Sequence, residues 1–255
     1  MWKRSVLTCL LLLSGRLAAA GDRVDVARLK RELLGTWECT SDTEQPPDTV
    51  FIKHVTPTRW SWVVYDRGKN AILAAAGGVW RIKDGHYEET CEYSMNPNLR
   101  GKTYRFSILI VGDKWEHRIL PGGELIVDEV WTRCKPTAAQ KANTGQAGRK
   151  LPGSWQATLG PNAPKAGRMI KHITPTHWTW VAFDFENRQV VASAGGTWTL
   201  RNGEYIETCL FTTDNFPQAR GNSYAFQYQI KGDRWVLKHG PGRAIAQDET
   251  WTLLK

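Results

Sequence analysis

The chain contains the same unit twice, and this internal repeat constrains its fold more than any other feature. Residues 52–63 (IKHVTPTRWSWV) match residues 170–181 (IKHITPTHWTWV), with equivalent positions 118 apart. After two residues are inserted near Asn215 and Phe216, the separation becomes 120. The other matched segments are 35–37 with 153–155, 77–80 with 195–198, 87–91 with 205–209, 112–115 with 232–235 and 128–131 with 248–251. A repeat of this extent predicts two domains of about a hundred residues each.

Within each unit the pattern is typical of short antiparallel strands. Large side chains alternate with other residues, as in Tyr205, Glu207, Cys209 and Phe211, and again in Tyr224, Phe226, Tyr228 and Ile230. Segments 201–203 and 231–233 carry glycine at turn positions. We expect about eight to ten strands per unit, and a closed barrel leaves no open edge. The predicted fold is therefore all-β, with two tandem small antiparallel barrels; a two-sheet sandwich is the alternative. A short helix is predicted at 26–34.

The N-terminus is typical of a secretory signal peptide. Lys3 and Arg4 precede the apolar run 6–13, and Ala18–Ala20 supply small residues for cleavage. We therefore expect a secreted or periplasmic protein, cleaved near Ala20. No later stretch approaches the roughly 20 apolar residues of a transmembrane helix. The predicted domains are a signal peptide at 1–20, barrels at 21–135 and 151–255, and a linker at 136–150.

The linker and the overall charge give weaker information. Residues 136–150 lack large apolar side chains, which predicts a flexible tether. The formal charge of +9 includes three basic residues of the signal segment. Because the remaining basic residues are scattered and export is expected, no nucleic-acid partner is predicted. The oligomeric state stays open.

The ends of the first unit resemble those of a known family. Gly35-Thr36-Trp37 follows the predicted helix, and the last strand ends in Trp131-Thr132-Arg133. This order resembles the lipocalin-like (calycin) barrels, and more closely the bacterial secreted lipocalin-like domains of unassigned function. The resemblance implies that Trp37 closes the barrel base with Arg133 packed over it. The second unit keeps Trp155 but has Leu253 in place of the arginine. The resemblance also implies a pocket in the barrel mouth for a small apolar or amphipathic molecule.

The cysteines of the first unit suggest a covalent link. Cys39 and Cys134 fall on the predicted first and last strands, which are neighbours in a closed barrel, and an exported protein permits a disulfide between them. Strand alternation opposes this bridge, since Cys39 shares a face with Trp37 whereas Cys134 lies opposite Trp131. Two buried thiols are the alternative. Cys91 and Cys209 are equivalent and are expected to be small buried residues.

Candidate ligand contacts lie on the aromatic face of each unit. A carboxylate among aromatic rings requires a partner or a proton, and a lysine, arginine or histidine on a neighbouring strand could supply the partner. Tryptophans on one strand face could stack on a planar or sugar-like ligand, or could simply fill the core. The two interior glutamates are Glu89 and Glu207, and Glu129 and Glu249 raise the same question. The predicted ligand-binding residues are His54, Trp60, Trp62, Tyr87, Glu89, Tyr104, His172, Trp178, Trp180, Tyr205, Glu207 and Tyr224.

These features predict a non-catalytic protein that binds a small molecule. No nucleophile–base pair or metal-ligand spacing occurs, so we expect no catalytic residues, no metal and no cofactor. Haem on an inward histidine is a minor alternative. Two other function classes remain open: a lyase or isomerase that uses the interior Glu and Tyr, and a structural envelope module with filled barrels. Interiors without a void of about 300 Å³ would count against ligand binding.

Overall fold

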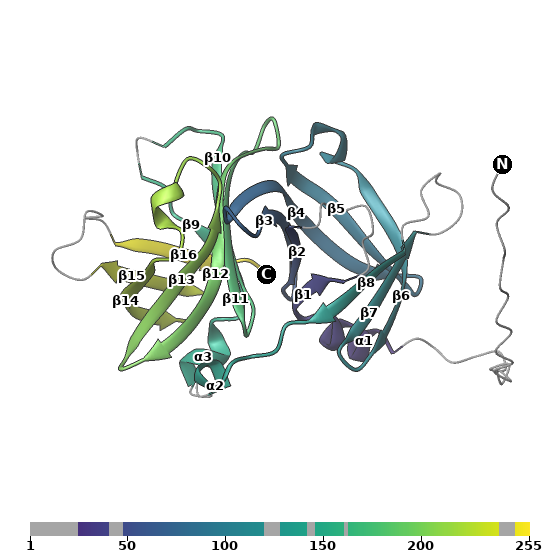
Figure 1. The fold of residues 1–255 in the computed structure, drawn as a ribbon, viewed down its shortest axis with the longest axis horizontal. Coiled ribbons are helices and arrows are strands. Elements are labelled where there is room, and N and C mark those ends of the chain that lie inside the picture. Colours follow the sequence, from purple (N-terminus) through teal and green to yellow (C-terminus); the bar gives the residue numbers. More distant parts are fainter. Residues whose placement is uncertain (1–24, 41–47, 120–127, 142–145, 161–162, 240–247) are drawn as a thin grey trace, which may run out of the picture.

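A computed structural model describes residues 25–40, 48–119, 128–141, 146–160, 163–239 and 248–255 (Figure 1). The predicted signal peptide lies outside these residues. The first half holds α1(Val26–Leu33), β1(Gly35–Cys39), β2(Thr49–Val55), β3(Arg59–Asp66), β4(Ala71–Lys83), β5(His86–Ser94), the 3₁₀ helix η1(Pro97–Leu99), β6(Thr103–Val111), β7(Lys114–Ile119) and β8(Asp128–Arg133). The second half holds β9(Gly153–Ala157), β10(Gly167–Ile173), β11(His177–Asp184), β12(Gln189–Arg201), β13(Glu204–Thr212), η2(Pro217–Ala219), β14(Ser223–Lys231), β15(Arg234–His239) and β16(Glu249–Leu253).

The predicted all-β class is confirmed. The strands in the described part of the chain join into one ring, in the order β1-β2-β3-β4-β13-β14-β15-β16-β9-β10-β11-β12-β5-β6-β7-β8. Pairings β4–β5 and β12–β13 occur in addition. Each of these two is a long antiparallel ladder, from Ala76↔Ser94 to Lys83↔His86 in β4–β5. By contrast, the halves are bridged by the single pairs Gln189↔Ser94 and Thr212↔Ala71. β1 also pairs with β8, and β9 with β16.

Glycine pairs in the long strands β4 and β12 lie opposite an extra residue, Glu92 of β5 and Leu210 of β13. The register shifts between Gly77 and Gly78 and between Gly195 and Gly196, which is the signature of a β-bulge. A Cβ built on Gly196 would lie 2.0 Å from the backbone oxygen of Thr208, so only glycine allows this approach. On β13, Tyr205 and Cys209 therefore face the second-half core, whereas Phe211 packs in a different cluster.

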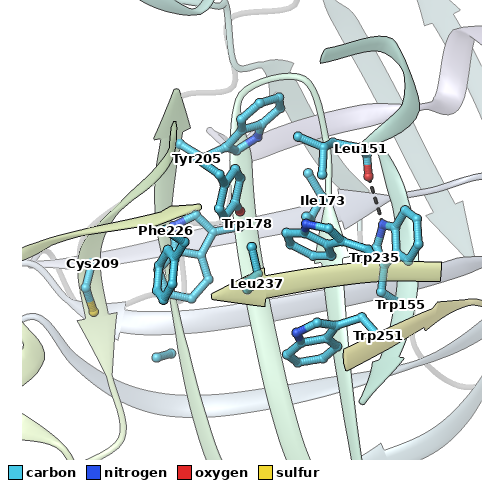
Figure 2. Packing of buried hydrophobic residues seen from close by; sticks show 12 residues of the cluster. Leu151, Trp155, Ile173, Trp178, Tyr205, Cys209, Phe226, Trp235, Leu237 and Trp251 are labelled. Atoms are coloured by element: carbon cyan, nitrogen blue, oxygen red, sulfur yellow. Dashed lines mark hydrogen bonds between the residues drawn. The ribbon is translucent and has the colours of Figure 1, made fainter. Parts of the chain in front are cut away.

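Each half has an aromatic core, and equivalent residues of the repeat build the two cores. The second-half core contains Trp155, Trp178, Trp235, Trp251 and Tyr205, which Figure 2 shows, together with Trp198. The equivalent rings of the first half form the first-half core with Tyr87. The indole of Trp155 donates to the carbonyl of Leu151 at 2.9 Å, as Trp37 does to Leu33.

Helix α1 is attached to the base of the first half. Its N-cap Asp25 accepts from the Arg28 backbone N–H, and Leu33 is fully buried. The guanidinium of Arg133 lies 4.0 Å from the Trp37 ring centroid and donates to the carbonyl of Leu34 at 2.7 Å. The Trp37–Arg133 contact is therefore present. In the second half, Leu253 packs against the core at this position. No helix within the described ranges is long and apolar enough to cross a membrane.

A junction of buried side chains joins the two halves, which lie side by side in Figure 1. Tyr65 stacks on Phe211 and Tyr93 stacks on Phe183, both with ring centroids 4.5 Å apart. These two stacks are equivalent under the repeat, with the tyrosine in the first half each time. Aliphatic side chains of both halves surround them, among them Ile52, Val63, Ile72, Ile170, Val181 and Val190.

The predicted disulfide between Cys39 and Cys134 is wrong. No disulfide links the cysteines in the described part of the chain. In the β1–β8 register, Trp37 pairs with Arg133 and Cys39 with Trp131. Cys39 packs against the first-half core, whereas Cys134 packs on the junction cluster that contains Phe211. The two thiols thus face opposite sides of the sheet, as strand alternation requires.

The connecting segment is more ordered than its composition predicts. It contains the short helices α2(Ala138–Lys141) and α3(Gln146–Lys150). Gln140 is buried, and its amide donates to the carbonyls of Thr176 and Trp198. The Gln140 side chain therefore ties the described part of this segment to the second half, which a count of apolar residues does not reveal.

Candidate functional site

A buried ion pair lies inside each half. Lys53 on β2 contacts Glu89 on β5 with Nζ and Oε1 2.8 Å apart, and the Tyr87 hydroxyl donates to the same oxygen at 2.7 Å. Lys171, Glu207 and Tyr205 repeat these contacts at the same distances. Both lysines are only 2% exposed. Because a buried carboxylate requires compensation, the lysine supplies the partner that each interior glutamate needs.

Aromatic rings surround each buried ammonium group. Lys53 Nζ lies 5.1–6.0 Å from the ring centroids of Trp60, Tyr87, Trp115 and Trp131. Lys171 Nζ has the equivalent tryptophans 178, 235 and 251 at 4.9–5.4 Å. Ring faces at these distances stabilise a cation. Three of the six repeated tryptophans in each half therefore pack around an internal charge.

The first half has a second pair of titratable groups that the other half lacks. His117 on β7 contacts Glu129 on β8, with Nδ1 and Oε2 2.7 Å apart, and Trp131 donates to the same oxygen at 3.1 Å. Leu237 occupies the position of His117 in the second half, although Glu249 and Trp251 are kept. The ring centroids of His117 and Phe106 lie 3.6 Å apart, and His117 Nε2 is buried without a hydrogen-bond partner among the described residues.

Burial and neighbouring charges shift the titration of this region. Burial lowers the pKa of His117, and the nearby Lys53 lowers it further. Burial alone raises the pKa of Glu129, but its hydrogen bonds with His117 and Trp131 and the nearby charge of Lys53 outweigh burial and hold the pKa below its ordinary value. Burial raises the pKa of Glu207 above its ordinary value despite Lys171. The pKa of Tyr87 lies well above 10 because of burial and the adjacent Glu89.

A cavity of about 170 Å³ opens beside these groups in the first half. Its polar wall consists of Lys53, Glu89, His117 and Glu129. The rest is apolar or aromatic: Phe51, Trp60, Trp62, Cys91, Leu99, Tyr104 and Phe106. This volume is below the roughly 300 Å³ named above, which counts against binding of a drug-sized molecule. It is close to the engineered apolar cavity of about 150 Å³ that holds benzene in another protein. The cavity thus suits a ligand with one ring.

The predicted site residues fall into three groups. Trp60, Trp62, Glu89 and Tyr104 line this cavity, and Tyr87 holds Glu89 from the core side. Their second-half equivalents also share one interior, where Trp178 and Tyr205 belong to the core, Trp180 and Tyr224 pack against it, and Glu207 pairs with Lys171. His54 and His172 lie elsewhere, on the opposite face of β2 and β10.

Both of these histidines belong to the junction. His54 Nδ1 is 3.1 Å from the Thr36 hydroxyl, and Nε2 is 2.8 Å from the Thr179 hydroxyl of the other half. His172 contacts Ser154 at 2.9 Å and the Tyr93 hydroxyl at 2.8 Å. Both ring nitrogens of each histidine are thus engaged in the junction, away from the first-half cavity. No group of three His, Cys, Asp or Glu side chains suited to a metal occurs within the described residues.

Sequence reasoning missed Lys53, Lys171 and His117. The repeat contained a signal for the lysines: each lies 36 residues before its glutamate, and each shares a strand face with core residues. No repeat signal exists for His117, because leucine stands at its equivalent position.

The aromatic rings at the outer side of the second-half interior differ from those of the first half. Phe216, from the two-residue insertion, contacts the ring of Trp180 edge-on with centroids 5.9 Å apart. In the first half, Trp62 instead contacts Phe51 at 5.4 Å, and Met169 replaces that phenylalanine in the second half. The two interiors are therefore distinct in both their charged groups and their outer rings.

Comparisons with known proteins give only remote structural likenesses. No protein family and no curated protein sequence matches the chain. An uncharacterized protein from Saccharomyces cerevisiae is similar with a TM-score of 0.46 and 10% identity, over 86% of this chain and 97% of the yeast chain. The DNA polymerase III beta subunit of Thermotoga maritima has a TM-score of 0.13 and 10% identity, over 86% and 55% of the two chains. The Helicobacter pylori beta clamp, solved with a DNA ligase peptide, has a TM-score of 0.13 and 9% identity, over 90% and 63%.

Proposed function

We propose that the protein is an exported, non-catalytic binding protein whose two halves act as tandem lipocalin-like barrels. The ladders β4–β5 and β12–β13, with β1 on β8 and β9 on β16, support a ring of eight strands in each half. The single residue pairs between the halves then count as bridges between barrels. Export rests on the N-terminal signal pattern alone.

The observation that carries the binding role is the first-half cavity. It combines aromatic walls with buried charged groups, as small-molecule sites do. Its volume of about 170 Å³ favours a single-ring molecule over the larger lipids that a wider barrel would hold. Glu89 is already engaged by Lys53 and Tyr87, which favours a structural role over acid–base catalysis for this Glu–Tyr pair.

Ligand-observed NMR with benzyl alcohol, a neutral single-ring probe, tests the binding role. We expect saturation transfer to the probe, and loss of it in Leu99→Trp, which fills the cavity wall. Ala219→Trp, the equivalent change in the second half, is the matched control and should leave the signal unchanged. Absence of transfer in the wild type, or equal transfer in Leu99→Trp, would contradict the proposal.

A further inference from the structure

The charged groups of the first-half cavity do not balance. Lys53 compensates Glu89 through a direct contact of 2.8 Å. The remaining carboxylate, Glu129, has His117 and Trp131 as its hydrogen-bond partners, both on Oε2. No hydrogen bond to a described residue ends on its Oε1. The direct partners of Glu129 therefore compensate its charge only if His117 is protonated, because Lys53 is paired with Glu89 and acts on Glu129 without a contact.

The surroundings of His117 favour its neutral form. An imidazolium would carry a second N–H at Nε2, and this atom is buried with no partner among the described residues. An unpaired buried N–H is costly, and more so when it is charged. In the neutral ring, Nδ1–H donates to Glu129 and Nε2 holds only a lone pair, so no donor is left unpaired. Glu129 then keeps its full negative charge.

The carboxylate also remains reachable from the cavity. Glu129 lines it, and its side chain is 20% exposed, whereas those of Lys53 and His117 are 2% exposed. Aromatic rings from Phe51, Trp62 and Tyr104 form part of the same wall. A carboxylate beside aromatic faces is the environment that stabilises an organic ammonium group.

We propose that the ligand of the first half is an organic cation of single-ring size, an arylalkylammonium compound whose ammonium group pairs with Glu129. This inference rests on the proposed function, because it names the ligand class of the same cavity. The second half lacks the His117 equivalent and carries Phe216 against Trp180, so it does not bind the same cation.

Titration calorimetry with benzylammonium and with its neutral analogue benzyl alcohol tests the ligand class. A charge-assisted hydrogen bond makes the cation at least about tenfold tighter. Glu129→Gln should remove this preference and still bind benzyl alcohol, which also shows that the variant folds. Glu249→Gln, the matched change in the second half, should keep it.

The outcomes separate the two proposals. Equal affinity for the two probes in the wild type, or a preference that survives Glu129→Gln, overturns the cationic ligand and leaves the binding cavity in place. Binding of neither probe overturns both. A cation preference that is lost in Glu249→Gln and kept in Glu129→Gln would place the site in the second half and overturn the role of Glu129.

Discussion

At the scale of single residues, the most consequential groups are charges placed inside aromatic cores. Lys53 and Lys171 are buried, each paired with a glutamate and faced by indole rings. A buried pair of this kind contributes little net stability as a pair, because desolvation offsets the attraction. Removing only one member is different, since it leaves a buried charge without compensation.

Lys53→Met should therefore destabilise the protein by roughly 3–5 kcal/mol, because Glu89 would keep only the Tyr87 hydroxyl as partner. The free energy of unfolding from urea titration measures this loss. Lys53→Met combined with Glu89→Leu removes both charges and should recover most of it. A single variant that loses less than about 1 kcal/mol would show that the pair is not buried as described.

The alternation of residues along strands predicted part of this arrangement. It placed Glu89 and Glu207 on the aromatic face and indicated that a basic partner was needed from a neighbouring strand. It did not identify Lys53, because lysine is rarely fully buried and its neighbour His54 looked equally suitable. Lys53 and His54 lie on opposite faces of their strand, and the repeat alone does not determine which of these faces points inward.

At the scale of elements, the glycine pairs in β4 and β12 determine where each aromatic face ends. The bulge at Gly195–Gly196 lets Cys209 face the second-half core while Phe211 reaches the junction. Without the extra residue, strict alternation would keep Phe211 on the same face as Cys209. A strand pattern in the sequence shows the two residues sharing a face, and the bulge is what separates them.

Gly196→Ala should destabilise the protein by roughly 3 kcal/mol or more. The new methyl group would lie 2.0 Å from the Thr208 carbonyl oxygen and 2.8 Å from the Leu210 nitrogen, and both of these are backbone atoms. Thermal unfolding followed by circular dichroism measures the effect. Gly160→Ala is the control: nothing lies within 4 Å of a Cβ there, so a change within about 0.5 kcal/mol is expected. Similar losses at both positions would argue against the bulge.

At the scale of the whole molecule, the junction makes the two halves depend on one another. Its stacked rings and histidines come from both units, and Thr36 contacts Thr174 at 2.6 Å while Thr56 contacts Ser154 at 2.7 Å. The sequence predicted two units but not how they meet, because each pairing joins residues from distant parts of the chain. The histidines at its centre make this contact sensitive to pH.

Stability should fall as the pH decreases below about 6.5. Burial, together with the nearby Arg59, lowers the pKa of His172 to about 3, and burial also lowers the pKa of His54 well below 6.5. Above pH 6.5 both folded and unfolded chains are neutral at these rings. Below it, only the unfolded chain takes up the protons, so each histidine removes about 2 kcal/mol between pH 7 and pH 5.

Urea titrations at the two pH values measure this loss. His172→Gln should reduce the pH dependence by about 2 kcal/mol, and His54→Gln should do the same, whatever each change does to stability at pH 7. A wild-type protein whose free energy of unfolding is unchanged between pH 7 and pH 5 would rule out buried neutral histidines at the junction.

The placement of both junction tyrosines in the first half has an evolutionary consequence. Exchanging one half for a copy of the other would pair tyrosine with tyrosine or phenylalanine with phenylalanine in these stacks. Two second halves would also lose the Tyr93 hydroxyl that His172 contacts. The duplicated units have thus become complementary rather than interchangeable. Selection now acts on them as a matched pair, and recombination between the repeats would yield chains whose junction no longer fits.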